Sequence, residues 1–339
     1  MCVLYLDKPD VKAKKIGGRV RVEQDGDCRA NIPIETLESV VIGERAHITT
    51  PLLFAFMERN IPVAYIRYDG RLAGTLGSGI SIRRLLAQQD AFSHPVIRPL
   101  LVREVIRRKM KGQISLLRTY AKRRGVEELT RLADAVCLHQ KALERHEGVD
   151  ELRGLEGIAS RITFDGFSYI LREPWTWTGR NRRPPKDPVN ALLSFGYTML
   201  EKEVRTAIYG ARLDPRFGFL HCDDIRRDSL VFDLMEPFRH DVIDRFVLKL
   251  LNCHALRPED FHKSDGGCWL SGDARRSWYG LYEEEIAAPV ERFDGRSPRE
   301  HIRHEIREFA VYTFGLQKKL GIMSEDDPDS EPEKTAESA

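Results

Sequence analysis

The stretch VIRPLLVREVIRRKMKGQISLLRTYAKRR, residues 96–124, decides the architecture of this chain. Its apolar residues recur three and four positions apart among basic residues, which predicts a long amphipathic helix. The same spacing continues from about residue 84 onward, whereas the residues before it have the features of short strands. We therefore expect an α+β multidomain protein, with a small antiparallel β domain of residues 1–85 followed by a larger all-α helical domain of residues 86–323.

The expected β domain rests on short segments that alternate in polarity or are rich in β-branched residues, and that Gly, Asp and Pro separate. One helix should interrupt them over residues 49–60, because Pro51 suits the first turn of a helix. A further strand should follow it at residues 61–66. The other expected strands are VLYLD (3–7), RVRVEQ (19–24), CRANIPI (28–34) and LESVVIG (37–43).

Composition excludes several classes of protein. The chain is 42% hydrophobic, but no apolar run approaches the roughly 18 residues of a membrane span. Its start does not have the pattern of a secretory signal, so we expect a cytoplasmic protein with no membrane partner. The six cysteines form no CxxC pair, which argues against a zinc knuckle and against a disulfide framework.

The net charge of +2 conceals an acidic tail and a basic body. Residues 324–339 hold seven acids and one lysine, a net charge of −6, and are too poor in apolar residues to fold, so we expect a disordered tail. The remaining chain therefore carries +8. Clusters of basic residues can neutralise the phosphates of nucleic acid, although each cluster alone is equally compatible with a solvated helix face. They are Arg107, Arg108, Lys109 and Lys111; Lys122, Arg123 and Arg124; and Arg180, Arg182, Arg183 and Lys186.

Acidic residues interrupt an apolar segment in GFLHCDDIRRDSLVFDLMEPFR, residues 218–239. If a helix follows residue 229, Asp233 and Glu236 share one face, and His240 and Asp244 continue that edge. A buried carboxylate without a partner costs several kcal/mol, roughly the net stability of a domain, so these acids should be paired or bound to a metal. Pro237 should place a kink or a helix start beside them.

Two further residues are candidates for the same site. Glu156 lies in ELRGLEGIASR, residues 151–161, on a predicted helix that two glycines weaken, and His221 follows the apolar GFL. One imidazole and two carboxylates suit manganese or magnesium better than calcium, and zinc stays possible. Singly, each residue is more often a salt-bridged or structural side chain, and no spacing rule joins Glu156 to His221.

Several segments, in the same order, resemble the CRISPR-associated adaptation integrase/endonuclease family, the "Cas-one" proteins. The resemblance covers most of residues 1–320. Its segments are IPIETLESVVIG (32–43), ITTPLLFAFMERNIPVAYI (48–66), GLEGIASRITF (154–164), RRPPKDPVNALLSFGYTML (182–200), and LDPRFGFLH with SLVFDLMEPFR (213–239).

This resemblance implies a homodimer built by the N-terminal β domain and a catalytic helical domain that holds Mg²⁺ or Mn²⁺. It implies that Glu156, His221 and Glu236 are the metal ligands, with Asp233 as an alternative or supporting ligand. The implied reaction is attack on a phosphodiester of double-stranded DNA by a 3′-hydroxyl, or by water in a nuclease. The implied partner is the small "Cas-two" protein.

The irregular segment EPWTWTGRNRRPPKDPVN, residues 173–190, then becomes a candidate for DNA contact. Its basic residues would hold the DNA backbone, and Trp175 or Trp177 would stack on an unpaired base or anchor the loop in the core. These basic residues are Arg180, Arg182, Arg183 and Lys186. The alternatives to an integrase are a stand-alone metal-dependent nuclease acting on branched DNA and a catalytically silent DNA-binding scaffold.

Overall fold

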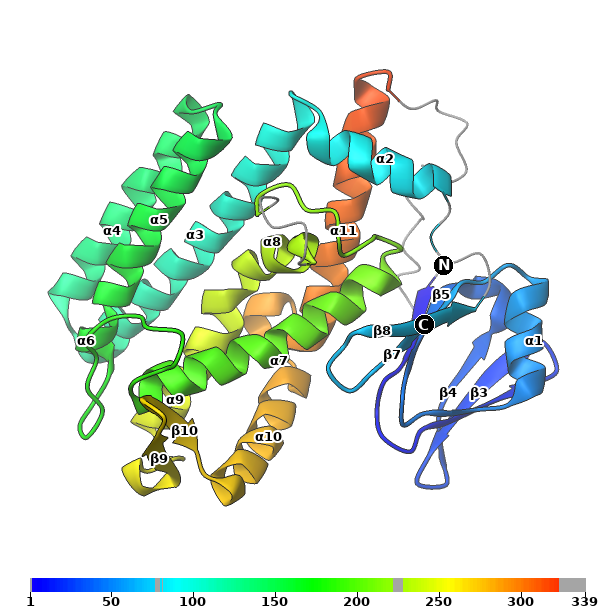
Figure 1. Cartoon of the computed structure of the whole chain (residues 1–339), viewed down its shortest axis with the longest axis horizontal. Coiled ribbons are helices and arrows are strands. Elements are labelled where there is room, and N and C mark those ends of the chain that lie inside the picture. The colour runs from blue at the N-terminus through cyan, green and yellow to red at the C-terminus, as the bar shows by residue number, and fades with distance from the viewer. Residues whose placement is uncertain (1, 77–79, 81, 222–227, 323–339) are drawn as a thin grey trace.

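A computed structural model describes residues 2–76, 80, 82–221 and 228–322 (Figure 1). The predicted acidic tail, residues 324–339, lies outside the described residues. A β-rich part precedes a mostly helical part, and the change falls between the last strand residue Leu76 and the first helix residue Ile82. Two separate clusters of buried apolar side chains lie on either side of it, one from residues 4–63 and one from residues 91–314. The predicted fold class, a β-rich region followed by a mostly helical domain, is confirmed.

Within residues 2–76, the β-rich part contains two four-stranded sheets, one α-helix, α1, and one short 3-10 helix, η1. The strand orders are β1-β5-β7-β8 in one sheet and β4-β3-β2-β6 in the other. The elements are β1 (Cys2–Leu6), β2 (Lys12–Ile16), β3 (Arg19–Gln24), β4 (Asp27–Pro33), η1 (Ile34–Thr36), β5 (Leu37–Gly43), β6 (His47–Ile48), α1 (Thr50–Glu58), β7 (Val63–Ile66) and β8 (Leu72–Leu76).

Pairing in these sheets is mixed, so the expectation of a purely antiparallel domain was wrong. Strands β2, β3 and β4 pair antiparallel, but β1 and β7 both run parallel to β5, and β6 runs parallel to β2. The chain passes through the other sheet between β1 and β5 and through α1 between β5 and β7, and such crossovers allow parallel strands. Residues 39–42 of β5 are buried without alternation, as expected of a strand covered on both faces.

The helical part also contains one β-hairpin, which corrects the expectation of an all-α domain. Strands β9 and β10 pair antiparallel around Asp265 and Gly266, whose φ angles are 51° and 71°. An Asp-Gly pair with positive φ at both positions is typical of a two-residue hairpin turn. The elements are α2 (Ile82–Ser93), α3 (Ile97–Arg124), α4 (Glu127–Ala142), η2 (Leu143–Arg145), α5 (Val149–Asp165), α6 (Phe167–Ile170), α7 (Pro188–Gly210), α8 (Ser229–Phe238), η3 (Arg239–Asp244), α9 (Arg245–Asn252), η4 (Pro258–Asp260), β9 (Phe261–Ser264), β10 (Gly267–Leu270), α10 (Gly272–Ala287), η5 (Glu291–Phe293) and α11 (Pro298–Lys319).

The predicted helix after residue 229 is interrupted. Helix α8 carries Pro237 inside its last turn, and a π-helical segment, η3, begins at Arg239 before α9 continues the chain. A proline removes one backbone donor and crowds the carbonyl four residues earlier, so a regular α-helix cannot continue through it undisturbed. The break that Pro237 predicts beside the acids is present.

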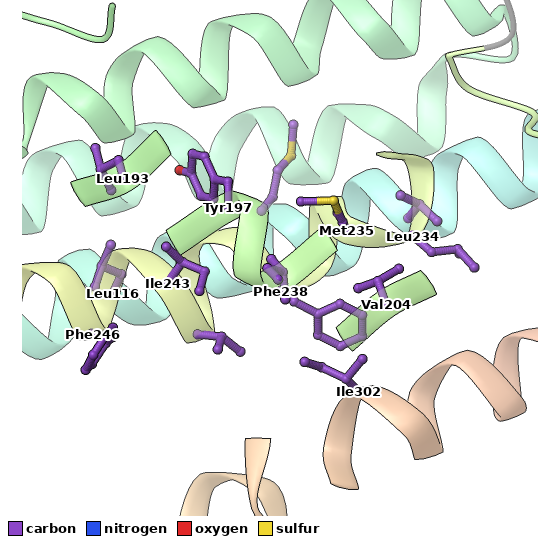
Figure 2. Packing of buried hydrophobic residues seen from close by; sticks show 14 of the residues in the cluster. Leu116, Leu193, Tyr197, Val204, Leu234, Met235, Phe238, Ile243, Phe246 and Ile302 are labelled. Atoms are coloured by element: carbon purple, nitrogen blue, oxygen red, sulfur yellow. The ribbon is translucent and has the colours of Figure 1, made fainter. Parts of the chain in front are cut away.

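Helix α7 passes through the middle of the helical core. Figure 2 shows its residues Leu193, Tyr197 and Val204 among side chains from α3, α8, η3, α9 and α11. Ile243 of η3 and Phe238 of α8 are buried in the same cluster. The helix α8, which carries Asp233 and Glu236, is therefore fixed by close packing. Within the described residues, no helix combines the length and the apolar composition needed to cross a membrane.

At Gly196, helix α7 lies close against η3. A Cβ added to Gly196 would lie 2.6 Å from Cγ2 of Ile243, which is too close for an unshifted side chain. Alanine gains about 1 kcal/mol of helix propensity, whereas overpacking costs about 1–3 kcal/mol. We expect Gly196→Ala to lower the free energy of unfolding by about 1 kcal/mol in chemical denaturation.

Gly280 of α10 provides the matched control, because a Cβ there meets nothing within 4 Å. Gly280→Ala should raise the stability by about 0.5–1 kcal/mol. If the two variants change stability equally, the contact between α7 and η3 is not tight.

Candidate metal-binding active site

Three helices that are distant in sequence enclose one pocket of about 590 Å³. Helix α3 contributes Lys109, α5 contributes Glu156 and α8 contributes Glu236, and His221 enters from the segment that precedes α8. The three residues that the resemblance implies as metal ligands therefore face the same space. Their role as ligands stays a prediction.

Glu236 is buried and ionised. Its Oε2 accepts a hydrogen bond from Lys109 Nζ at 2.5 Å, and its Oε1 accepts one from Arg239 Nε at 3.0 Å. Burial alone would raise the pKa of this carboxyl, but the charges of Arg239 and Lys109 outweigh burial and hold the pKa well below its usual range. Glu236 therefore offers a negative charge to the pocket at neutral pH.

Lys109 joins the two glutamates. Its ammonium donates to Glu156 Oε1 as well as to Glu236 Oε2. Burial lowers the pKa of Lys109, but the two carboxylates reverse that effect and raise the pKa above its usual value. Glu156 Oε1 also accepts a hydrogen bond from Ser160 Oγ at 2.9 Å, one turn further along α5. The two carboxylates thus share one positive charge.

Asp233 is fully buried and has all its hydrogen bonds made inside the protein. Its Oδ2 accepts from the backbone N–H groups of Phe219 and Leu220 at 2.7 and 2.9 Å, and its Oδ1 accepts from the backbone N–H of His221 at 2.8 Å. The turn wraps tightly around this carboxylate, because a Cβ on Gly218 would lie 2.6 Å from Oδ2. Asp233 therefore supports the segment that carries His221.

His221 is oriented by the same carboxylate. Its Nδ1 lies 2.8 Å from Asp233 Oδ1, which makes Nδ1 the protonated nitrogen and leaves Nε2 as the acceptor. Burial lowers the pKa of His221, but the hydrogen bond and charge of Asp233 raise it above the usual value. Among the described residues Nε2 has no partner, and the side chain is about half exposed (49%). A histidine held in this way is typical of a metal ligand.

Among the described residues, no three His, Cys, Asp or Glu side chains already lie in the arrangement that would hold one metal ion. The position of the Lys109 ammonium explains this, because it lies between the two carboxylates where they would share a dication. The donor set nevertheless fits a divalent metal: two carboxylates that converge on one cation and an imidazole with a free Nε2.

A second polar layer lies behind the carboxylates. His240 Nδ1 is 2.6 Å from Asp244 Oδ2, and Tyr197 donates its hydroxyl to Asp244 Oδ1 at 2.7 Å. Gln113 Nε2 lies 3.0 Å from His240 Nε2 and 3.3 Å from Ser160 Oγ. The acidic edge predicted for residues 233–244 is therefore present, but its His240 and Asp244 end is closed into the core.

The basic segment before α7 divides into an inner and an outer part. Arg180 turns inward and donates to Asn190 Oδ1 at 2.8 Å and to Ser194 Oγ at 3.1 Å. Arg182 and Arg183 are exposed and line the pocket that holds the glutamates, and Lys186 is exposed on the same segment. DNA contact by these four residues stays a prediction, for which the geometry favours the outer ones.

The two tryptophans of this segment anchor it to the core. Trp175 is buried and donates its indole N–H to the carbonyl of Leu251 at 2.9 Å. Trp177 packs against Phe167, with ring centroids 5.1 Å apart. Trp175 is therefore buried as a core residue, and Trp177, which is partly buried, packs on the core beside it.

Sequence reasoning missed the role of Lys109, which it placed only in a basic cluster. A signal was available in the spacing. Val105, Lys109, Gln113 and Leu116 follow one another at intervals of four, four and three residues along one side of α3, and all of them are buried. A lysine on the buried side of a helix needs a carboxylate partner, and this one has two.

Comparison with known proteins shows the family. The profile of the family described as CRISPR associated protein Cas1 matches residues 4–284. The CRISPR-associated endonuclease Cas1 1 of Thermus thermophilus is 34% identical over 292 residues, covering 85% of this chain and 87% of that protein. The CRISPR-associated endonuclease Cas1 2 of Rhodospirillum rubrum is 32% identical over 297 residues, covering 83% and 85%.

Solved structures have the same fold. A Cas1 protein from Thermotoga maritima aligns with a TM-score of 0.62 at 26% identity, over 92% of this chain and 97% of that chain. A chain of a partial Cas6-RT-Cas1–Cas2 complex aligns with a TM-score of 0.80 at 22% identity, over 96% and 99%. A casposase bound to its integration product aligns with a TM-score of 0.79 at 21% identity, over 99% and 100%. The chain belongs to the Cas1 family of CRISPR-associated proteins.

Proposed function

We propose that this protein is a metal-dependent DNA integrase and endonuclease that inserts spacer DNA into a CRISPR repeat array. The observation that carries the proposal is that Glu156, Glu236 and His221 converge on one pocket, which Arg182 and Arg183 also line. Among the described residues the Nε2 of His221 has no partner. Family membership adds CRISPR adaptation, and the endonuclease names of the relatives add the reaction class. We place this activity in the cytoplasm.

Glu156, His221 and Glu236 are the residues that would hold Mg²⁺ or Mn²⁺. When bound, such a cation activates an attacking oxygen and stabilises the charge that develops on a phosphoryl group. Glu236 is kept ionised by Arg239, and His221 is kept in the correct tautomer by Asp233. The charge of Glu236 and the tautomer of His221 are thus in place before DNA binds, and charges fixed in advance are the condition for electrostatic catalysis.

The DNA backbone is the ligand we propose for the outer arginines. Guanidinium groups bind phosphate oxygens through paired N–H donors, and Arg182 and Arg183 form no ion pair with any described carboxylate. Strand ends held there would reach the glutamates in the same pocket. A duplex with a free 3′-hydroxyl is the substrate that this arrangement suits.

Assembly with other chains is proposed on family grounds. Solved relatives include Cas1–Cas2 complexes and a Cas1–DNA complex. We propose a homodimer formed through the N-terminal β-rich part, with a small Cas2-type protein as its partner.

Strand transfer tests the proposal directly. Short duplexes with 3′-hydroxyl ends, a supercoiled plasmid that carries a repeat array, and Mn²⁺ should yield plasmid joined to the duplex. Duplexes with dideoxy 3′ ends serve as the control and should yield no joined product. Cleaved strands without joining would instead indicate a stand-alone nuclease on branched DNA. Binding without either product would indicate a scaffold.

Asp233 should act on the metal through His221. Asp233→Asn removes the charge that orients the imidazole, and loss of such a supporting group typically weakens metal binding about 10–100-fold. We expect the midpoint of Mn²⁺-dependent strand transfer and of Mn²⁺-dependent thermal stabilisation to rise together by that factor. The control is Asp165→Asn, an exposed carboxylate on the same helix as Glu156. Equal Mn²⁺ midpoints for the wild type and both variants would show that Asp233 does not support metal binding.

A further inference from the structure

A second pocket, of about 460 Å³, adjoins the active pocket and is mostly apolar. Its walls come from Pro184 and Pro185 of the basic segment, Phe195 of α7, and Trp269 and Leu270 of β10. Arg182 and Arg183 line both pockets. A strand that leaves the glutamates past these arginines therefore meets the second pocket next.

Trp269 presents its ring to this pocket with its polar group already satisfied. The indole N–H donates to the carbonyl of Ser264 at 3.1 Å, and the residue is 42% exposed. A partly exposed tryptophan offers a large apolar ring to a ligand, and tryptophan is enriched among residues that contribute most to binding. The exposed part of the ring is suited to stacking, and its indole N–H needs no further hydrogen bond.

The hairpin that carries Trp269 is locked to the basic segment. The backbone N–H of Cys268 donates to the carbonyl of Pro185 at 2.7 Å. Gly267 permits this approach, because a Cβ there would lie 2.9 Å from Pro184 Cβ and 2.9 Å from Trp269 Nε1. The aromatic wall and the arginines are therefore held in one fixed relation, as a preformed binding site requires.

The arginines that line this second pocket indicate the chemical class of its ligand. Arg182, Arg183 and Arg275 are exposed at the pocket, and none of them forms an ion pair with a carboxylate in the described parts of the chain. An apolar floor under uncompensated guanidinium groups is complementary to a nucleotide, whose base is flat and apolar on its faces and whose phosphate is anionic.

We propose that this pocket binds one unpaired base of a DNA strand, stacked on Trp269, while Arg182 and Arg183 hold the flanking phosphates. The inference rests on the proposed function, because it takes the strand to be the one whose end enters the active pocket. The stacking residue is then Trp269 on the hairpin, because Trp175 is bonded to the backbone of the core and Trp177 packs against Phe167.

The test is binding of full-length protein to duplexes with single-stranded 3′ overhangs, measured by fluorescence anisotropy in a chelator. Each overhang position is replaced in turn by an abasic nucleotide. Stacking of one base contributes roughly a tenfold gain in affinity, so one position should weaken binding by the wild type about tenfold. Trp269→Ala should weaken binding to the intact overhang about tenfold. In this variant, the abasic nucleotide at that position should cause no further loss of affinity.

Two further variants serve as controls for this experiment. Trp269→Phe keeps an aromatic face and should retain the penalty of the abasic position. Tyr312→Ala removes a similarly exposed aromatic ring (42%) on α11 and should leave every affinity unchanged. The proposal is overturned if no abasic position matters, if its penalty persists in Trp269→Ala, or if that variant weakens blunt duplexes equally. Because no chemistry occurs in chelator, failure here is distinguishable from failure of strand transfer.

Discussion

Replacing Glu236 by glutamine is expected to slow strand transfer about 10²–10³-fold while leaving DNA affinity nearly unchanged. Glutamine keeps the shape of the side chain but removes the charge that Lys109 and Arg239 hold in place. The substitution should lower the rate of strand transfer and not the DNA affinity, because the arginines that we assign to the DNA backbone lie on a different segment. Initial rates of plasmid joining with saturating Mn²⁺ measure the effect, and anisotropy in chelator measures the affinity.

The control for this experiment is Glu284→Gln, which neutralises an exposed glutamate on α10. It should join DNA at the wild-type rate. Glu236→Gln would count against the site if it retained more than about a tenth of the activity, or if its DNA affinity fell as far as its rate. The second outcome would make Glu236 a folding residue.

Replacing Lys109 by methionine is expected to destabilise the metal-free protein by about 3–5 kcal/mol. The ammonium is the charge shared by Glu156 and Glu236, and its side chain is only 7% exposed. Its removal leaves two carboxylates facing each other with Arg239 as the remaining partner of Glu236. Chemical denaturation in chelator gives this difference directly.

Manganese should restore part of that loss. If Lys109 holds the position that a dication takes, Mn²⁺ must displace it in the wild type but not in the variant. The rise in melting temperature on adding Mn²⁺ should therefore be larger for Lys109→Met than for the wild type. Lys111→Met, an exposed neighbour on the same helix, should match the wild type in both conditions. Equal stabilisation of all three proteins by Mn²⁺ would separate Lys109 from the metal position.

Sequence alone predicted the elements better than their partners. The period of residues 96–124 predicted α3, and the alternation of residues 19–24 predicted β3. Parallel pairing of β1 with β5 escaped prediction because alternation reports which face of a strand is buried and not which strand lies beside it. The β9–β10 hairpin was missed although its Asp265-Gly266 turn carried a recognisable signal.

The candidate site shows the same division. Spacing placed Asp233 and Glu236 on one face, and both are buried there. It could not separate their surroundings, because Asp233 is surrounded by backbone N–H groups of residues 219–221 and Glu236 by cations from α3 and η3. Those partners come from outside the helix, so only the folded arrangement distinguishes a supporting carboxylate from one that faces the pocket.

The π-helical segment η3 sets the rotation of α9 relative to α8. It allows Glu236 on α8 to face the pocket while Phe246 on α9 faces the core. It contains the one extra residue that separates a π turn from an α turn, and each residue of an α-helix advances by about 100°. Without that insertion, the whole of α9 would be rotated out of phase with α8. Phe246, whose ring centroid now lies 5.0 Å from that of Trp278, would leave the core. The length of residues 239–244 is therefore as constrained as the chemistry of Glu236. Deleting a single residue there would turn the apolar side of α9 away from the core, although every active-site side chain would remain in the sequence.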